Sequence, residues 1–223
     1  MKDDAGSAPG TTARPRARFP VGIGIGASAG GPRALMTLLA QLELPVSAFA
    51  FLVQHIHPKF TEILCRRLGE VSHLPVVSAT DGLEARAGHL YVAPAGAHLA
   101  VTRRWPCTFR LNLLNTPPRH GVRPAVDELF LSLAKAFGPR TIGVVLTGMG
   151  RDGLDGARAI KADGGIVFAE AESTCVVYGM PRALAEAGIA DSLLPIGEMA
   201  KAIRAAAMST AEHGAAVLVR SGG

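Results

Sequence analysis

The fold of this chain is decided by a glycine-rich segment near its N-terminus, which reads VGIGIGASAGGP over residues 21–32. The apolar run before Ser28 is typical of a buried strand, and residues 32–42 repeat apolar side chains at helical spacing. The segment therefore predicts a sharp turn from a strand into a helix. GxGxxA from Gly24 fits a dinucleotide-binding loop, and GxSxG from Gly26 fits the elbow that carries a nucleophilic serine. A turn that needs glycines only for steric reasons is a third interpretation.

Apolar runs alternate with helical patterns along the rest of the chain. After the first strand at 19–26, further strands are predicted at 48–54, 75–78, 141–147, 165–169 and 189–194. Further helices are predicted at 59–71, 124–137, 153–162, 181–188 and 199–208. Short runs broken by turns at 88–94, 98–103 and 108–114 predict an antiparallel insert. We expect an α/β fold: a doubly wound, mainly parallel sheet in a three-layer, Rossmann-like α/β/α arrangement with a small antiparallel hairpin.

The length and composition are those of one globular α/β domain, or at most of two small ones. Of the 223 residues, 48% are hydrophobic and 18% are charged, enough to bury a sizeable core. We expect a disordered tail at residues 1–18, a folded domain at 19–208 and a C-terminal extension at 209–223. The three cysteines show no paired spacing, and no apolar run is long enough to span a membrane or to act as a signal peptide. These features predict a cytoplasmic protein.

The net charge of +5 does not indicate a nucleic-acid partner. The tail contributes +2 of it, and the basic residues elsewhere are scattered singly or in pairs. Aromatic residues make up only 5% of the chain, which leaves few surfaces on which bases could stack. We therefore predict neither nucleic-acid binding nor insertion into a membrane.

The ends of the predicted strands separate the interpretations of the glycine-rich turn. A dinucleotide site needs an acid at the tip of the second strand to bind the ribose, but residues 54–57 read QHIH. A nucleophilic Ser28 instead needs a nearby imidazole, and His55 stands at that tip. With strand order 3-2-1-4, the strand at 141–147 flanks the first one and leads to Asp152. Neighbouring strands lie about 4.8 Å apart, so Ser28, His55 and Asp152 are predicted to meet as a catalytic triad.

Simpler roles stay open for these residues. Asp152 also stands where it could merely cap the following helix. His55 and His57 are spaced like a pair of metal ligands, but no third ligand has an obvious spacing. We therefore predict no metal and no cofactor.

The residues quoted so far belong to a larger set of motifs that resembles the catalytic domain of the CheB methylesterase family. The resemblance covers residues 19–208. Its motifs, in chain order, are GASAGG (26–31), VQH (53–55), YVAP (91–94), RPAVD (123–127), LTGMGRDG (146–153) and CVVYGMPR (175–182).

The resemblance implies hydrolysis of glutamate γ-methyl esters on the cytoplasmic helices of chemoreceptors, with deamidation of some glutamines. It places the nucleophile, base and acid on Ser28, His55 and Asp152, and the oxyanion donors on the backbone N–H groups of His55 and Met149. We add Ala29, Gly30 and Met180 as residues expected to line the substrate loop. The expected partner is a methylated chemoreceptor or a related signalling protein, and no oligomeric state is predicted.

Three departures from the family pattern affect what is expected of this chain. Eighteen tail residues are too few for the receiver domain of well-known members, so switching by phosphorylation in cis is not expected. Ala29 replaces a threonine, and Arg151 replaces Asn or Asp. A cation at Arg151 is expected to favour the ionised form of Asp152. The alternatives are a non-catalytic signalling-partner module with the same fold and, further off, a dinucleotide-binding oxidoreductase.

Overall fold

A parallel sheet forms the centre of the molecule in the computed structural model, which describes residues 19–105 and 107–220. The predicted tail, residues 1–18, lies outside the described residues. Within the described part, seven strands pair in the order β3-β4-β2-β1-β7-β8-β9, and every pair is parallel. These strands are β1 (Val21–Ala27), β2 (Ala48–Gln54), β3 (Val76–Ser78), β4 (Leu90–Val92), β7 (Thr141–Val145), β8 (Ile166–Glu170) and β9 (Ser192–Leu194).

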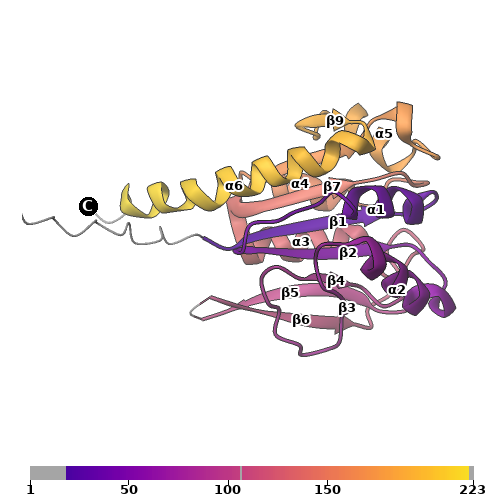
Figure 1. The fold of residues 1–223 in the computed structure, drawn as a ribbon, viewed down its shortest axis with the longest axis horizontal. Coiled ribbons are helices and arrows are strands. Elements are labelled where there is room, and N and C mark those ends of the chain that lie inside the picture. The colour runs from indigo at the N-terminus through magenta and orange to yellow at the C-terminus, as the bar shows by residue number, and fades with distance from the viewer. Residues whose placement is uncertain (1–18, 106, 221–223) are drawn as a thin grey trace, which may run out of the picture.

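Helices cover both faces of this sheet, as the doubly wound pattern predicted (Figure 1). One face packs against α1 (Gly31–Leu39), α2 (Thr61–Val71) and α6 (Ile196–Arg220). The other packs against α3 (Val126–Phe137), α4 (Leu154–Ala162) and α5 (Met180–Glu186). The connections in the described ranges also contain three single-turn 3-10 helices, at Pro58–Phe60, Gly138–Arg140 and Glu172–Thr174. The predicted three-layer fold is confirmed.

The alternating glycines of β1 decide how closely α3 approaches the sheet. The apolar residues of β1 between them point into the core under α1 and α6, while Gly22, Gly24 and Gly26 face α3. A Cβ at Gly24 would come within 2.7 Å of Leu133, and one at Gly26 would overlap Val126 at the start of the helix. The glycines therefore form a groove in which α3 lies, and this packing accounts for the GxGxG pattern without a nucleotide.

A two-stranded antiparallel hairpin completes the fold. It consists of β5 (His98–Arg104) and β6 (Thr108–Leu114), and it packs against α3, where the Phe109 and Phe137 rings stack with centroids 4.0 Å apart. The prediction that residues 88–94 belong to this insert is wrong. Leu90–Val92 is β4, a parallel strand between β3 and β2. Its side chains alternate between the two cores, since Leu90 and Val92 are buried on one face of the sheet and Tyr91 on the other.

The last helix differs in length from its prediction. It begins at Ile196 and runs to Arg220, so the boundary expected between residues 208 and 209 falls inside a helix. Its apolar residues continue the packing on the β1 face beyond the predicted end, since Ala211 is buried there. Among the described residues, none of the helices combines the length and apolar composition that crossing a membrane requires.

Candidate active site

The carboxyl ends of β1, β2 and β7 bring the predicted site residues to one edge of the sheet. Ala27 pairs with Gln54 in register, so Ser28 and His55 follow directly from neighbouring strand ends. β7 pairs with the other side of β1. The Ser28 N–H donates to the Thr147 carbonyl at 3.0 Å, which ties the serine turn to the loop that leads to Asp152.

His55 and Asp152 form a direct contact across 97 residues of sequence. The Nε2 atom of His55 lies 2.7 Å from Oδ2 of Asp152, and only 3% of the Asp152 side chain is exposed. In this hydrogen bond Nε2 of His55 carries the ring proton and donates to the carboxylate. Nδ1 of His55 is therefore the nitrogen that can accept a proton. The predicted base and acid are therefore brought together.

Asp152 is ionised because hydrogen bonds compensate for its burial. Burial alone would raise the pKa of Asp152, but His55 and the backbone N–H groups of Asp127 and Val126 hold that pKa below its usual value. Both N–H groups come from the first turn of α3: that of Val126 donates to Asp152 at 2.7 Å and that of Asp127 at 3.0 Å. Burial would raise the pKa of Asp155, but Arg119 and, to a lesser extent, Arg151 lower that pKa. The expected effect of Arg151 on Asp152 stays a prediction.

Gln54 joins the serine turn to the histidine turn, a role that sequence reasoning missed. Its buried side chain donates from Nε2 to the carbonyl oxygens of Ser28, at 2.8 Å, and His55, at 3.0 Å. Its Oε1 lies against Gly31, where any Cβ would overlap it. The signal in the sequence was a polar residue at the end of an otherwise apolar strand, which is costly to bury unless it is hydrogen-bonded.

Thr147 extends this bracing to the loop after β8. Its hydroxyl donates to the Ala29 carbonyl at 2.9 Å and accepts the Val177 N–H at 2.9 Å. Its own N–H donates to the buried Glu170 carboxylate at 2.8 Å. The loops after β1, β7 and β8 are thus held as one unit around Ser28.

The Ser28 side chain is partly exposed and makes no hydrogen bond among the described residues. Gly148 lies directly beneath it, since a Cβ there would come within 2.7 Å of the Ser28 Cβ. Ala29 is exposed and Gly30 is half-buried, and their place beside a substrate stays a prediction. Met180 is fully buried beneath Gly148, so its predicted place in the substrate loop is wrong. Its thioether instead supports that loop from inside.

The backbone N–H groups of His55 and Met149 are the two predicted oxyanion donors, and only the first is already hydrogen-bonded within the described residues. The His55 N–H donates to the Ala27 carbonyl at 3.0 Å, because the β1–β2 ladder continues one residue past both strands. Within the described residues the Met149 N–H has no acceptor, and neither has the N–H of Ala29, the residue after the serine. Free donors of this kind are what an oxyanion needs. The GxSxG pattern could have indicated Ala29, because in a nucleophile elbow the backbone N–H of the residue after the serine contributes to the oxyanion hole.

One cluster in the described part of the chain has the spacing of metal ligands. Side-chain ligand atoms of His120, Asp127 and Asp152 lie within 4.8 Å of one another. The Asp152 oxygens already accept hydrogen bonds from His55 and two backbone N–H groups, and those of Asp127 accept from His120 and Gly156. Hydrogen bonds therefore satisfy the cluster without a cation, and we assign no metal to it.

Comparisons with known proteins agree on one family. The family model described as CheB methylesterase matches residues 23–203. The chain is similar to proteins named protein-glutamate methylesterase/protein-glutamine glutaminase from Clostridium acetobutylicum, at 44% identity over 80% of this chain, and from Pyrococcus abyssi, at 39% over 82%. It covers 51% and 50% of those two proteins, so it spans about half the length of the curated relatives.

A solved structure gives the same answer for the fold. The crystal structure of the Thermotoga maritima CheB methylesterase catalytic domain matches with a TM-score of 0.79 at 39% identity. The match covers 82% of this chain and 96% of that one. A relative this similar over nearly its whole length, together with the family model, settles the classification: the chain belongs to the CheB methylesterase family.

Proposed function

We propose that this chain is a serine hydrolase that removes the methyl group from glutamate γ-methyl esters on the cytoplasmic helices of chemoreceptors. The observation that carries the proposal is the 2.7 Å contact of His55 with the buried Asp152, at the strand end next to Ser28. A histidine oriented by an ionised acid is what a serine needs in order to become a nucleophile at neutral pH. The names of the curated relatives support both the ester substrate and a second activity on glutamine.

The first half of the reaction forms an acyl-enzyme. Ser28 Oγ attacks the ester carbonyl while its proton passes to Nδ1 of His55, and Asp152 stabilises the resulting imidazolium. The oxyanion forms within reach of the Met149 and Ala29 N–H groups, and a donor of this kind is worth on the order of 10²–10³ in rate. The tetrahedral adduct then breaks its bond to the methoxy oxygen, which takes the proton from His55 and leaves as methanol.

The second half restores the enzyme. Water attacks the acyl carbonyl and gives its proton to His55, and the adduct then breaks its bond to Ser28 Oγ, which takes that proton back. The products are the glutamate side chain and free Ser28. A glutamine substrate would follow the same path with ammonia as the leaving group, more slowly because an amide is harder to cleave than an ester.

Replacement of Ser28 tests the proposal directly. Ser28→Ala should reduce the release of radiolabelled methanol from methylated receptor membranes by on the order of 10⁴-fold or more, because the acyl bond has no oxygen to form on. Labelling by a fluorophosphonate probe should be lost with it. Ser78→Ala is the matched control, since Ser78 is an exposed serine at the end of β3, separated from β1 by two strands.

Two results would overturn this assignment. Methanol release by Ser28→Ala near the wild-type rate would remove Ser28 as the nucleophile. A correctly folded wild type that neither releases methanol nor reacts with the probe would favour a non-catalytic signalling module with the same fold.

A further inference from the structure

The loop before α3 contains a tight turn whose backbone is strained. Arg119 and Val122 exchange two backbone hydrogen bonds of 3.1 Å and 3.0 Å, so His120 and Gly121 are the two central residues of the turn. Both have positive φ, 52° for His120 and 77° for Gly121. Glycine adopts this conformation freely, but a residue with a side chain does so at an energetic cost. The position of the imidazole therefore needs an explanation outside the turn.

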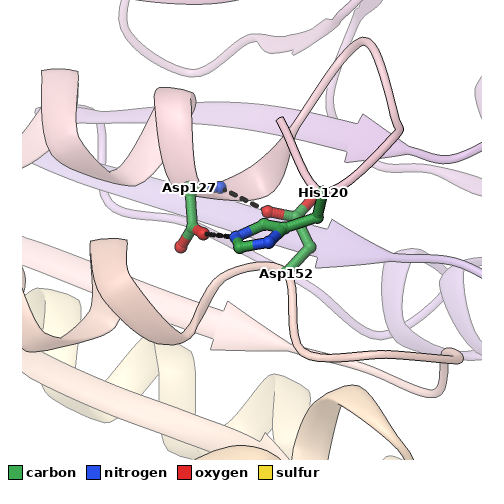
Figure 2. Close-up of side chains that lie close together, drawn as sticks. All are labelled: His120, Asp127 and Asp152. Carbon is green, nitrogen blue, oxygen red and sulfur yellow. Dashed lines mark hydrogen bonds and ion pairs between the residues drawn. The ribbon is translucent and has the colours of Figure 1, made fainter. Parts of the chain in front are cut away.

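That explanation is the Asp127 carboxylate. His120 Nε2 lies 2.9 Å from Oδ2 of Asp127 (Figure 2). Nε of Arg119 lies 3.4 Å from the same oxygen. The other oxygen, Oδ1, accepts the Gly156 N–H from the first turn of α4 at 2.8 Å. The Asp127 side chain is fully buried. One carboxylate thus joins the turn, the start of α3 and the start of α4.

The same residue also contacts the acid of the proposed triad. The Asp127 backbone N–H donates to the Asp152 carboxylate (Figure 2). The Val126 N–H donates to the same carboxylate, which also contacts His55. The Asp127 side chain therefore fixes the first turn of α3, and the backbone of that turn fixes Asp152. A shift of this turn would move both donors at once, and small displacements of catalytic groups are costly in rate.

We propose that Asp127, held by the Arg119–Val122 turn, is a positioning residue that keeps Asp152 in its catalytic orientation toward His55. The inference rests on the proposed function, because it assigns a supporting role within the same site. Nothing in this role requires Asp127 or His120 to touch the substrate.

The charge of Asp127 adds an effect that can be measured. Its carboxylate lies within 4.8 Å of ligand atoms of Asp152 and His120. The charged or titratable groups that surround this pair of carboxylates are His55, Arg119, His120, Glu128 and Asp155. Arg119 would keep its pairs with Glu128 and Asp155 after removal of the negative charge at Asp127. The surroundings of the triad would still lose one negative charge, which works against a positive charge on the His55 ring.

The experiment compares Asp127→Asn and His120→Ala with Arg158→Ala as the matched control. Arg158 also pairs with Asp155, at 3.1 Å, but does not contact Asp127. With methylated receptor membranes, Asp127→Asn should lower kcat roughly tenfold and leave KM within about twofold. The acid limb of its kcat/KM profile should move to lower pH. His120→Ala, on an exposed turn, should lower kcat roughly threefold without loss of the fold, and Arg158→Ala should behave as wild type.

The NMR signal of the His55 Nε2–H proton separates failure of this inference from failure of the proposed function, because it reads the His55–Asp152 bond even in an inactive protein. A weaker or shifted Nε2–H signal in Asp127→Asn would support the positioning role even if no methyl ester is cleaved. The inference is wrong if folded Asp127→Asn and His120→Ala keep both the wild-type kcat and the wild-type Nε2–H signal. It is equally wrong if these variants only lower the unfolding temperature while the pH profile stays unchanged.

Discussion

Asp152 is almost completely buried and still charged, because three hydrogen-bond donors contact its two carboxylate oxygens. His55 and Val126 donate to Oδ2, and Asp127 donates to Oδ1. An amide at this position would turn one acceptor into a donor that faces another N–H group. It would also allow the His55 ring to carry its proton on the wrong nitrogen.

Asp152→Asn should therefore fold but lose most of its activity. We expect kcat for methanol release to fall by about 10⁴-fold, since the imidazole is held in the wrong tautomer. The mismatched donor should also cost about 1–3 kcal/mol of unfolding free energy in urea. Full activity in this variant would exclude Asp152 from the triad.

Cys175 lies near the site, but its thiol is expected to be unreactive. Burial, and to a lesser extent the charge of Glu170, raises the pKa of Cys175 to about 12, so the thiol stays protonated at neutral pH. The thiolate is the nucleophilic form of cysteine. Brief exposure to iodoacetamide at pH 8 should therefore leave Cys175 unmodified in the folded protein, as read by peptide mass spectrometry. Alkylation as fast as that of the same cysteine in urea would contradict this.

Helix α3 connects the packing against β1 with the position of Asp152 in the site. Its side chains lie against the glycines of β1, and its first turn supplies the two N–H groups that hold Asp152. The site therefore depends on how deeply this helix is seated. An added methyl group under its first turn would displace the donors as well as the core.

Gly26→Ala tests this connection, because the new Cβ would overlap the Val126 side chain. The unfolding free energy in urea should fall by about 1–3 kcal/mol, and activity should fall further than the loss of folded protein explains. Gly69→Ala is the control: a Cβ at this position in α2 meets only Val76, at 3.9 Å, and should stabilise the helix by up to about 1 kcal/mol. An active, stable Gly26→Ala variant would show that α3 tolerates a shift.

The buried carboxylates of Asp152 and Asp127 should change the free energy of unfolding with pH in opposite directions. The pKa of Asp152 is lowered on folding, since hydrogen bonds from His55, Asp127 and Val126 outweigh its burial. Its stabilising contribution is therefore complete above the unfolded pKa of about 3.9 and is lost as the pH falls through the folded pKa. The pKa of Asp127 is raised, mainly by burial and also by the charge of Asp152. Its contribution is lost as the pH rises from about 3.9 through the folded pKa.

Urea unfolding of wild type and Asp152→Asn across a range of pH checks this sign. The difference in unfolding free energy between them should stay constant down to about pH 4 and shrink below it. A difference that grows toward acid pH would mean that Asp152 is not held ionised by the fold.

The amino-acid sequence by itself determined the alternation of strands and helices, the parallel sheet with helices on both faces, and the three strand ends that carry Ser28, His55 and Asp152. These follow from local patterns, because apolar periodicity and glycines report on each element separately. The order of β2, β1 and β7 then followed from the topology common to such sheets.

Only the tertiary structure decided which groups surround these three residues. The place of β4, the burial of Met180, the hydrogen bonds of Gln54 and the contact of Asp127 with His120 all depend on segments distant in the chain. The glycines of β1 illustrate the difference, since their pattern fits a phosphate-binding loop and their neighbours show a groove for α3. A sequence pattern records what a residue can do, while the packing of remote elements determines which of those possibilities is used.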